Sequence, residues 1–175
     1  ISGIDWFFKH VDSGIILEDD ISISDNCLDS FRTLLEEYKS SKNILTISSH
    51  NEFINTEEQA LILSPVWRSW GWATWKDKWL LHKELSEKAS KYSINKINSL
   101  FPKDFKNLNN AKLIKACQLG LFDTWDFEFN FSHLALGYYS LTMTGYNSTN
   151  FGFDIDATHT KEKSEDSFKY EKTNN

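Results

Sequence analysis

The apolar positions in the first third of the chain follow two spacings that predict alternating helices and strands. Residues 2–12 and 25–40 have apolar side chains at helical spacing, which predicts two helices. Gly14 follows the first helix, and residues 15–17 form a short apolar run typical of a strand buried on both faces of a mostly parallel sheet. Residues 44–48 predict another strand. Helices that alternate with short strands indicate an α/β fold.

The middle of the chain is rich in tryptophan. Residues 61–67 form an extended run that stops near Pro65. Trp72, Trp75 and Trp79 follow at the three- and four-residue spacing of one helical face. We expect Trp75 and Trp79 to be docked in the core.

The remaining pattern predicts further helices, a last strand and a polar end. Residues 82–115 predict two or three helices broken near Pro102, without evident chemistry. Residues 124–136 predict a helix, residues 138–143 a strand and residues 145–154 a loop. Residues 161–175 have little apolar content, which predicts a disordered tail or linker.

Three consecutive carboxylates, Glu18, Asp19 and Asp20, follow the strand predicted at residues 15–17. Ligands of open α/β sheets bind at the carboxyl ends of strands. Adjacent acids raise one another's pKa unless a cation neutralises them, and their hard oxygen atoms select Mg²⁺ or Mn²⁺. The alternatives are a solvated acidic turn and the phosphoacceptor strand of a signalling receiver domain. The receiver alternative is weaker because we place no strand-end lysine of the kind that such domains use.

Trp70, Gly71 and Trp72 form a second candidate site. A glycine between two indoles lets the backbone approach a ligand closely while the rings flank it. Aromatic residues make up 15% of the chain and include seven tryptophans, and such rings both fill cores and stack on sugars and bases.

Asp126 and His159 are the other candidate functional residues. Asp126 falls in the first turn of the helix predicted at residues 124–136, where the helix dipole favours an ionised carboxylate. It is either a general base among aromatic neighbours or a plain first-turn acid that stabilises the helix. His159, between two threonines, is either a surface residue or a metal ligand together with the region of Asp20.

Charge and cysteine content narrow the classes of partner. The formal net charge of -6 argues against a nucleic-acid protein, which needs a basic patch. Cys27 and Cys117 form no CxxC spacing and no disulfide framework, which favours a reducing compartment. No apolar run is long enough to span a bilayer. The chain starts at Ile1 rather than Met and enters directly into an apolar segment, so we expect earlier strands upstream in the parent protein.

Five separated stretches, taken in order, resemble the bacterial nucleotide-diphospho-sugar transferases of the GT-A fold, and distantly the N-acetylglucosaminyltransferase I group. These stretches are IDWFF (4–8), GIILEDD (14–20), WGWATW (70–75), TWD (124–126) and NFGF with DATHT (150–153 and 156–160). The resemblance implies a Rossmann-like, mixed and mostly parallel sheet flanked by helices. It covers residues 1–160, which lack the family's first β-α-β units, and so implies a partial, N-terminally truncated GT-A domain.

On the donor side, the resemblance implies a divalent cation, Mn²⁺ or Mg²⁺, that bridges the protein to the donor diphosphate. Asp20 matches its direct ligand, and His159 matches a late histidine that many GT-A enzymes use on the metal or diphosphate. Asp19 and Glu18 match positions that contact the donor's ribose or sugar and the waters of the metal.

On the acceptor side, the resemblance implies that Asp126 is the base that deprotonates an acceptor hydroxyl. The family more often has Trp-Asp-Tyr here, whereas this chain has Phe127. Trp70, Gly71 and Trp72 match a loop and helix near the sugar and acceptor.

The resemblance therefore implies a metal-dependent glycosyltransferase. The expected substrates are a nucleotide-sugar donor, favoured as a UDP-sugar with inversion, and a saccharide or glycoconjugate acceptor. The expected location is the bacterial cytoplasm or the inner face of its membrane, where surface polysaccharides are assembled. The alternative is a non-catalytic carbohydrate- or nucleotide-binding module derived from such an enzyme.

Overall fold

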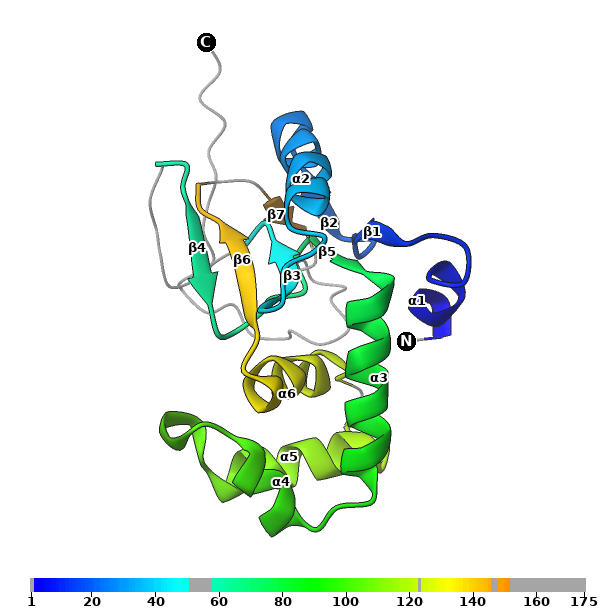
Figure 1. Ribbon diagram of the computed structural model, residues 1–175, viewed down its shortest axis with the longest axis vertical. Coiled ribbons are helices and arrows are strands. Elements are labelled where there is room, and N and C mark those ends of the chain that lie inside the picture. Colours follow the sequence, from blue (N-terminus) through cyan, green and yellow to red (C-terminus); the bar gives the residue numbers. More distant parts are fainter. Residues whose placement is uncertain (1, 51–57, 123, 146–147, 152–175) are drawn as a thin grey trace.

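The computed structural model describes residues 2–50, 58–122, 124–145 and 148–151 (Figure 1). In chain order the elements are α1 (Ser2–Phe7), β1 (Ser13–Ile16), β2 (Ile21–Ile23), α2 (Asp25–Glu37), β3 (Ile44–Ser48), β4 (Leu61–Ser64), β5 (Trp72–Trp75), α3 (Lys76–Ser90), α4 (Ile94–Leu100), a 3-10 turn (Lys103–Phe105), α5 (Leu108–Gln118), α6 (Asp126–Leu136), β6 (Tyr139–Met143) and β7 (Ser148–Asn150). Helices flank a central sheet, so the predicted α/β class is confirmed. In these ranges no helix has the length and apolar character that a membrane span requires.

The central sheet is mixed, as predicted, but the prediction that it is mostly parallel is wrong for the described strands. The strand order is β1-β5-β3-β6-β4. Only β3 and β6 pair in parallel, whereas β5 is antiparallel to both β1 and β3, and β4 is antiparallel to β6. An apolar run predicts burial on both faces, and β3 and β5 are both fully buried. Burial does not determine the direction of the neighbouring strand, which depends on contacts distant in sequence.

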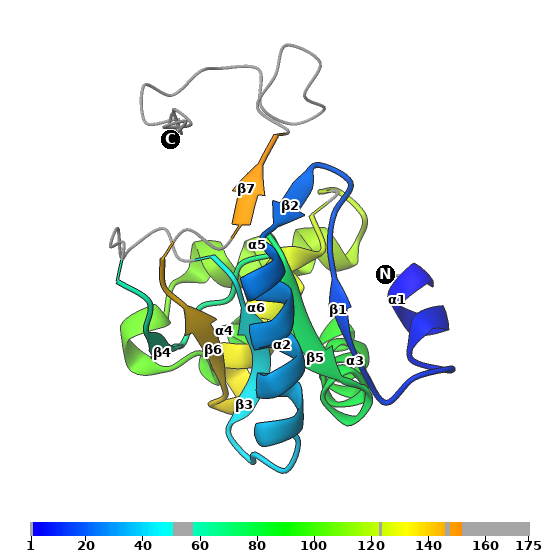
Figure 2. The same ribbon diagram turned by 90° about the horizontal axis from the view of Figure 1, so that it is seen from above.

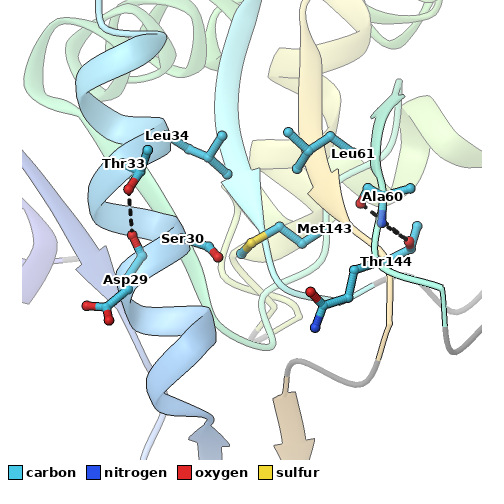
Figure 3. A pocket seen from close by; sticks show the side chains of 9 residues that line it. Asp29, Ser30, Thr33, Leu34, Ala60, Leu61, Met143 and Thr144 are labelled. Atoms are coloured by element: carbon cyan, nitrogen blue, oxygen red, sulfur yellow. Dashed lines mark hydrogen bonds between the residues drawn. The ribbon is translucent and has the colours of Figure 1, made fainter.

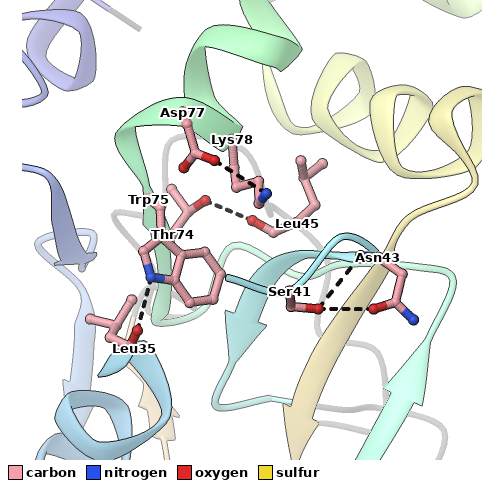
Figure 4. Close-up of polar contacts among 8 residues, drawn as sticks. All are labelled: Leu35, Ser41, Asn43, Leu45, Thr74, Trp75, Asp77 and Lys78. Carbon is pink, nitrogen blue, oxygen red and sulfur yellow. Dashed lines mark hydrogen bonds and ion pairs between the residues drawn. The ribbon is translucent and has the colours of Figure 1, made fainter. Parts of the chain in front are cut away.

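Helix α2 covers one face of the sheet (Figure 1). Its first turn is capped by Ser24, whose hydroxyl oxygen accepts a hydrogen bond from the backbone N–H of Cys27 at 3.2 Å. The apolar stripe of α2 packs on β3, β5 and β6. From β5, Trp75 donates its indole N–H to the backbone carbonyl of Leu35 at 2.9 Å (Figure 4). This bond joins the sheet to α2.

The opposite face of the sheet is covered by an aromatic core. Trp72 of β5, Trp79 of α3 and Phe129 of α6 are at most 1% exposed, and Trp67 lies among them. The ring centroid of Trp67 lies 5.0 Å from that of Trp72 and 4.8 Å from that of Phe129, both in edge-on geometry. Such contacts add to the free energy gained by burial alone.

The tryptophans of residues 72–79 correct one sequence prediction and confirm another. Trp75 and Trp79 are 4% and 1% exposed, so their predicted place in the core is confirmed. The predicted common helical face is wrong, because Trp72 and Trp75 lie on strand β5 and belong to core clusters on opposite faces of the sheet. Helix α3 begins only after Trp75.

Two histidines are buried in the aromatic core as neutral rings. His133 Nδ1 lies 2.8 Å from the carbonyl of Phe129, which can only accept, so Nδ1 has the proton. His133 Nε2 therefore accepts the hydroxyl hydrogen of Thr46 at 2.8 Å. His82 Nδ1 lies 2.7 Å from the hydroxyl of Ser132, which itself donates to a carbonyl of α6, so this nitrogen is also the donor. Burial lowers the pKa of His133 to about 4 and that of His82 to about 3.

Helices α4 and α5 form a further layer on the side of α3 and α6 away from the sheet (Figure 1). They pack through small and aromatic side chains, including Ala111 and Phe131. The predicted helices in 82–115 are confirmed, and α4 ends at Leu100, just before the predicted break at Pro102.

The N-terminal segment differs from its prediction. Helix α1 ends at Phe7, and Gly14 lies inside β1 rather than after a long helix. A Cβ atom on Gly14 would lie 2.2 Å from the ring of Phe7, so the glycine makes room for that ring. Strand β1 is half-buried and pairs with β5 alone among the described strands, and Leu17 is 44% exposed, so the predicted burial on both faces is wrong.

Strand β7 lies within residues 145–154, which the sequence predicted as a loop. It pairs with β2 in a separate two-stranded antiparallel sheet, with Ile21 opposite Asn150 (Figure 2). The backbone N–H of Phe151 then donates to the carbonyl of Asp20 at 2.8 Å. The last described residues are therefore held against the acidic segment that follows β1.

Candidate functional site

The three acids Glu18, Asp19 and Asp20, called the acidic turn below, lie at the carboxyl end of β1 as predicted. The backbone N–H of Ile21 donates to the carbonyl of Glu18 at 3.1 Å, which closes a tight turn. Asp19 is exposed, while Glu18 and Asp20 are partly buried. The turn therefore presents carboxylates in two environments, one open to water and one partly enclosed.

Asp20 has the feature that a bound cation would explain. Its Oδ1 atom is buried and has no hydrogen-bond partner among the described residues. A buried carboxylate oxygen without a partner is costly unless a cation or donor compensates it, so this atom fits a divalent metal ligand. The described ranges contain no group of three or more His, Cys, Asp and Glu side chains placed to hold a metal. His159, the other predicted ligand, lies outside the described residues.

Asp126 begins helix α6, as predicted from its first-turn position. Trp125, the residue before it, packs its ring 5.3 Å from Trp67 in the aromatic core. Asn130, one turn later on the same side of the helix, accepts the backbone N–H of Trp67 at 2.8 Å. Helix α6 therefore presents Asp126 toward the segment that follows Trp67.

That segment, residues 67–71, is called the tryptophan loop below, and it is held by two serines from the end of β3. The Ser48 hydroxyl lies 3.3 Å from the carbonyl oxygen of Arg68. The Ser49 hydroxyl lies 2.9 Å from the carbonyl oxygens of both Trp70 and Gly71. The backbone N–H of Ser49 also donates to the Gly71 carbonyl at 3.0 Å. These bonds, with the one to α6, define the position of the loop at both ends.

Gly71 lets the tryptophan loop approach the acidic turn. Its φ angle is +79°, a conformation that favours glycine. An added Cβ would lie 2.7 Å from Ser49 Oγ, 3.3 Å from Ile23 and 3.4 Å from Leu17. Leu17 precedes the acidic turn and Ile23 follows it, so Gly71 packs against both flanks of the turn. The sequence predicted that Gly71 lets the backbone approach a ligand closely. In the structure its backbone closely approaches side chains of the protein itself.

The variant Gly71→Ala is expected to destabilise the protein more than Gly137→Ala. Gly137 also has a positive φ of +68°, but nothing lies within 4 Å of its Cβ position. Both variants incur the cost of a left-handed alanine, about 1 kcal/mol. Only Gly71→Ala must also displace Ser49, which adds roughly 1–3 kcal/mol. Urea unfolding of both variants measures the difference, and equal losses would contradict the tight packing at Gly71.

The carboxylates of the acidic turn and Asp126 interact electrostatically. Burial raises the pKa of Glu18 above its usual value. The charges of Asp20, Asp126 and Asp19, in that order, raise it further. Two segments distant in sequence therefore place their acids in one region.

Two basic side chains lie in the same region. Burial lowers the pKa of Arg68, and the negative charge of Asp126 opposes this shift. Burial, together with the smaller effect of the Arg68 charge, lowers the pKa of His50 to about 4. The His50 ring lies against Trp70, with centroids 4.4 Å apart. The site therefore contains a guanidinium, a neutral imidazole and an indole beside its acids.

Trp70 and Trp72, which the sequence analysis placed near the sugar and acceptor, differ in their exposure to solvent. Trp70 is partly exposed, and its ring lies against that of His50. Trp72 is fully buried in the aromatic core, so the prediction that it contacts a sugar or acceptor is wrong in this structure. The reason is that Trp72 begins strand β5, where its side chain points into the core.

The sequence analysis identified neither Arg68 nor His50 as a site residue. The relevant signals were the position of His50 just beyond β3 and the presence of an arginine among tryptophans. Neither signal indicates that residues 67–71 lie near the start of α6. That placement depends on the hydrogen bond from the Trp67 backbone N–H to the side chain of Asn130.

A cavity of about 610 Å³ lies elsewhere, between α2, β4 and β6 (Figure 3). Leu34, Leu61 and Met143 form its apolar part, and Asp29 and Thr144 are among its polar lining residues. It shares no residue with the acidic turn, the tryptophan loop or α6. The predicted chemistry is therefore not located in this cavity.

Chemically, the site combines a partly buried acidic turn with a separate acid at a helix start and an aromatic surface beside it. The acidic turn suits a cation and a charged ligand, and Asp126 suits proton transfer. Compared with known protein families and with curated proteins, the sequence gives no match to either.

Proposed function

We propose that the protein is a metal-dependent glycosyltransferase that moves a sugar from a nucleotide-diphosphate donor, favoured as a UDP-sugar, to a hydroxyl of a saccharide or glycoconjugate acceptor. The observation that supports this most is that the charge of Asp126, from a distant part of the chain, adds to burial and the charge of Asp20 in raising the pKa of Glu18 in the acidic turn. The GT-A resemblance assigns donor and acceptor roles to the same two segments.

On the donor side, Asp20 would provide a protein ligand for Mn²⁺ or Mg²⁺ through its buried oxygen. The cation would neutralise charge on the diphosphate leaving group. Asp19 is exposed beside it and suits hydrogen bonds to sugar or ribose hydroxyls. The backbone of residues 148–151 lies against the acidic turn, and the backbone N–H of Phe151 donates to the Asp20 carbonyl. His159 follows Phe151 by eight residues in the sequence.

On the acceptor side, Asp126 would act as the general base. As the acceptor oxygen forms its bond to the sugar's anomeric carbon, the bond to the nucleotide diphosphate breaks and the hydroxyl proton passes to the Asp126 carboxylate. Trp70 would cover one side of the acceptor and limit access of water.

Calorimetric titration of UDP into the full-length protein tests this proposal. We expect binding with Mn²⁺, no measurable binding with excess chelator, and at least about tenfold weaker binding in Asp20→Asn. Asp25→Asn, an exposed first-turn residue of α2, is the matched control and should bind as the wild type does. Binding that is indifferent to metal would overturn the proposal in favour of a non-catalytic module. Absence of binding in the folded protein would also overturn it.

A further inference from the structure

Positive charge is concentrated in the layer that α4 and α5 form (Figure 1). Residues 92–122, which include both helices, contain five lysines and a single acid, Asp104, whereas the whole chain has a net charge of -6. Lys106 and Lys112 are exposed, and within the part of the chain that the structure describes neither side chain forms a hydrogen bond or an ion pair. Acids are frequent again from Asp123 onward, so the positive excess is local to this layer. It can attract an anionic partner that the net charge of the chain would repel.

Helix α5 displays leucines on the same face as one of these lysines. Leu108, Lys112 and the C-cap residue Leu119 are four and seven residues apart, so they share one face along about 16 Å of the helix. Leu108 is 48% exposed and Leu119 is 65% exposed. Lys115 donates to two backbone carbonyls just before α4, which holds α5 in its place. The helix therefore has a fixed, exposed stripe with a lysine between two leucines.

The turn after α5 adds two large apolar side chains, Leu121 and Phe122, which are 71% and 55% exposed. The backbone N–H of Gly120 donates to the Cys117 carbonyl, and that of Leu121 donates to the Ala116 carbonyl, both at 2.9 Å. This is the Schellman arrangement, which ends a helix at a glycine with a positive φ, here +69°. The apolar side chains are therefore exposed on an ordered backbone, as expected of an interaction surface.

The types of side chain favour a lipid surface over a protein partner. Protein interfaces are enriched in arginine and depleted of lysine, whereas residues 92–122 contain five lysines and no arginine. Surfaces that lie in the headgroup region of a bilayer combine lysine with leucine and phenylalanine. Their apolar side chains enter the boundary between headgroups and acyl chains, and their lysine ammonium groups reach the lipid phosphates. The surface around α5 has this combination.

We propose that this surface, called the α5 face below, docks the protein on a bilayer that contains anionic lipid. The α5 face consists of Lys106, Leu108, Lys112, Leu119, Leu121 and Phe122. Phe122 precedes Asp126 by four residues, so docking would hold the start of α6 near the lipid surface. The α5 face shares no residue with the acidic turn, and docking therefore does not depend on the proposed sugar transfer.

Co-sedimentation of the full chain with lipid vesicles tests this proposal. One set of vesicles is phosphatidylcholine alone, and the other contains about 30% phosphatidylglycerol, both in about 0.1 M salt. We expect the partition coefficient to be at least about tenfold higher for the anionic vesicles. It should fall about tenfold or more when the salt is raised to about 0.5 M, because salt screens the lysine charges.

The double variant Lys106→Gln with Lys112→Gln should lower partition onto the anionic vesicles by about 10- to 30-fold, since each lysine near anionic headgroups contributes roughly fivefold. Lys9→Gln with Lys42→Gln is the matched control. It removes the same charge from exposed lysines outside the α5 face, and it should change partition by less than about twofold.

A second pair of variants tests the apolar contribution. Leu121→Ser with Phe122→Ser should lower partition by about tenfold or more and keep its salt dependence. Leu61→Ser with Leu63→Ser, two exposed leucines of β4, is the control and should bind as the wild type does. Circular dichroism identifies a variant that fails to fold, and the wild-type comparison of the two vesicles stands without it.

Equal partition of the wild type onto neutral and anionic vesicles would overturn the proposal. A wild type that binds neither kind of vesicle would also overturn it and favour an acidic protein as the partner of the α5 face. So would a folded Lys106 and Lys112 double variant that binds like its control. A protein that fails to bind UDP but docks through the α5 face would lose the transferase proposal and keep this one.

Discussion

Replacing Asp126 with Asn is expected to lower the turnover number for sugar transfer by roughly 10²- to 10⁴-fold, the usual contribution of a general base. The amide has the same shape but cannot take the proton of the acceptor hydroxyl. UDP affinity in the presence of Mn²⁺ should change less than about twofold, because the role proposed for Asp126 concerns the acceptor and not the donor. Steady-state kinetics and calorimetry on the same preparation measure both quantities.

The control for this variant is Asp77→Asn. Asp77 is an exposed aspartate in the first turn of α3, so its replacement also removes a charge at a helix start. Loss of such a charge costs about 0.3–1 kcal/mol of stability and should leave turnover unchanged. If Asp126→Asn retained near-normal turnover with a similar small loss of stability, Asp126 would be a plain helix-stabilising acid.

The sequence predicted elements whose signal is local. Strand β3 occupies residues 44–48 as expected, and α2 begins after a serine cap as expected. The acidic turn follows β1 as expected. A short apolar run that breaks into acids indicates the end of a strand, whichever strands pair with it. Such features depend on residues close in the chain.

The failed predictions needed information from distant residues. Trp72 and Trp75 fit a helical spacing, and only the pairing of β5 between β1 and β3 makes them strand residues. Strand β7 is short and polar, and it is held by β2 and by the Asp20 carbonyl rather than by its own propensity. Arg68 became a site residue through contacts of its neighbour with α6.

The same distant contacts explain why the site is ordered. The tryptophan loop is bonded to β3 through Ser48 and Ser49 and to α6 through Asn130. Beneath it, Trp67 and Trp125 join the loop and the start of α6 to one aromatic core. Side chains attached to such a frame would need little rearrangement if a ligand bound there.

The second prediction concerns the two histidines buried in the aromatic core. As the pH is lowered from 6.5 to about 4, the free energy of unfolding should fall steeply. His133 and His82 are neutral in the folded protein, with pKa values lowered by burial to about 4 and about 3. In the unfolded chain both rings protonate near pH 6.5. Below that pH the unfolded state binds more protons, so each ring removes about 1.4 kcal/mol of stability per pH unit. The contribution is fully present above pH 6.5.

Urea unfolding at pH 5.0, 5.5, 6.0 and 6.5 measures the slope of stability against pH. The carboxyls of Glu18 and Glu128, whose pKa values burial raises, oppose the histidines, so the test compares variants rather than absolute slopes. His133→Gln should reduce the wild-type slope by about 1.4 kcal/mol per pH unit. Thr46→Val, which removes the hydroxyl bonded to His133 but no titrating group, should lower stability at every pH by about 1–3 kcal/mol and keep the slope. If His133→Gln left the slope intact, His133 would be exchanging protons with solvent in the folded state, and the aromatic core would be more open than its packing indicates.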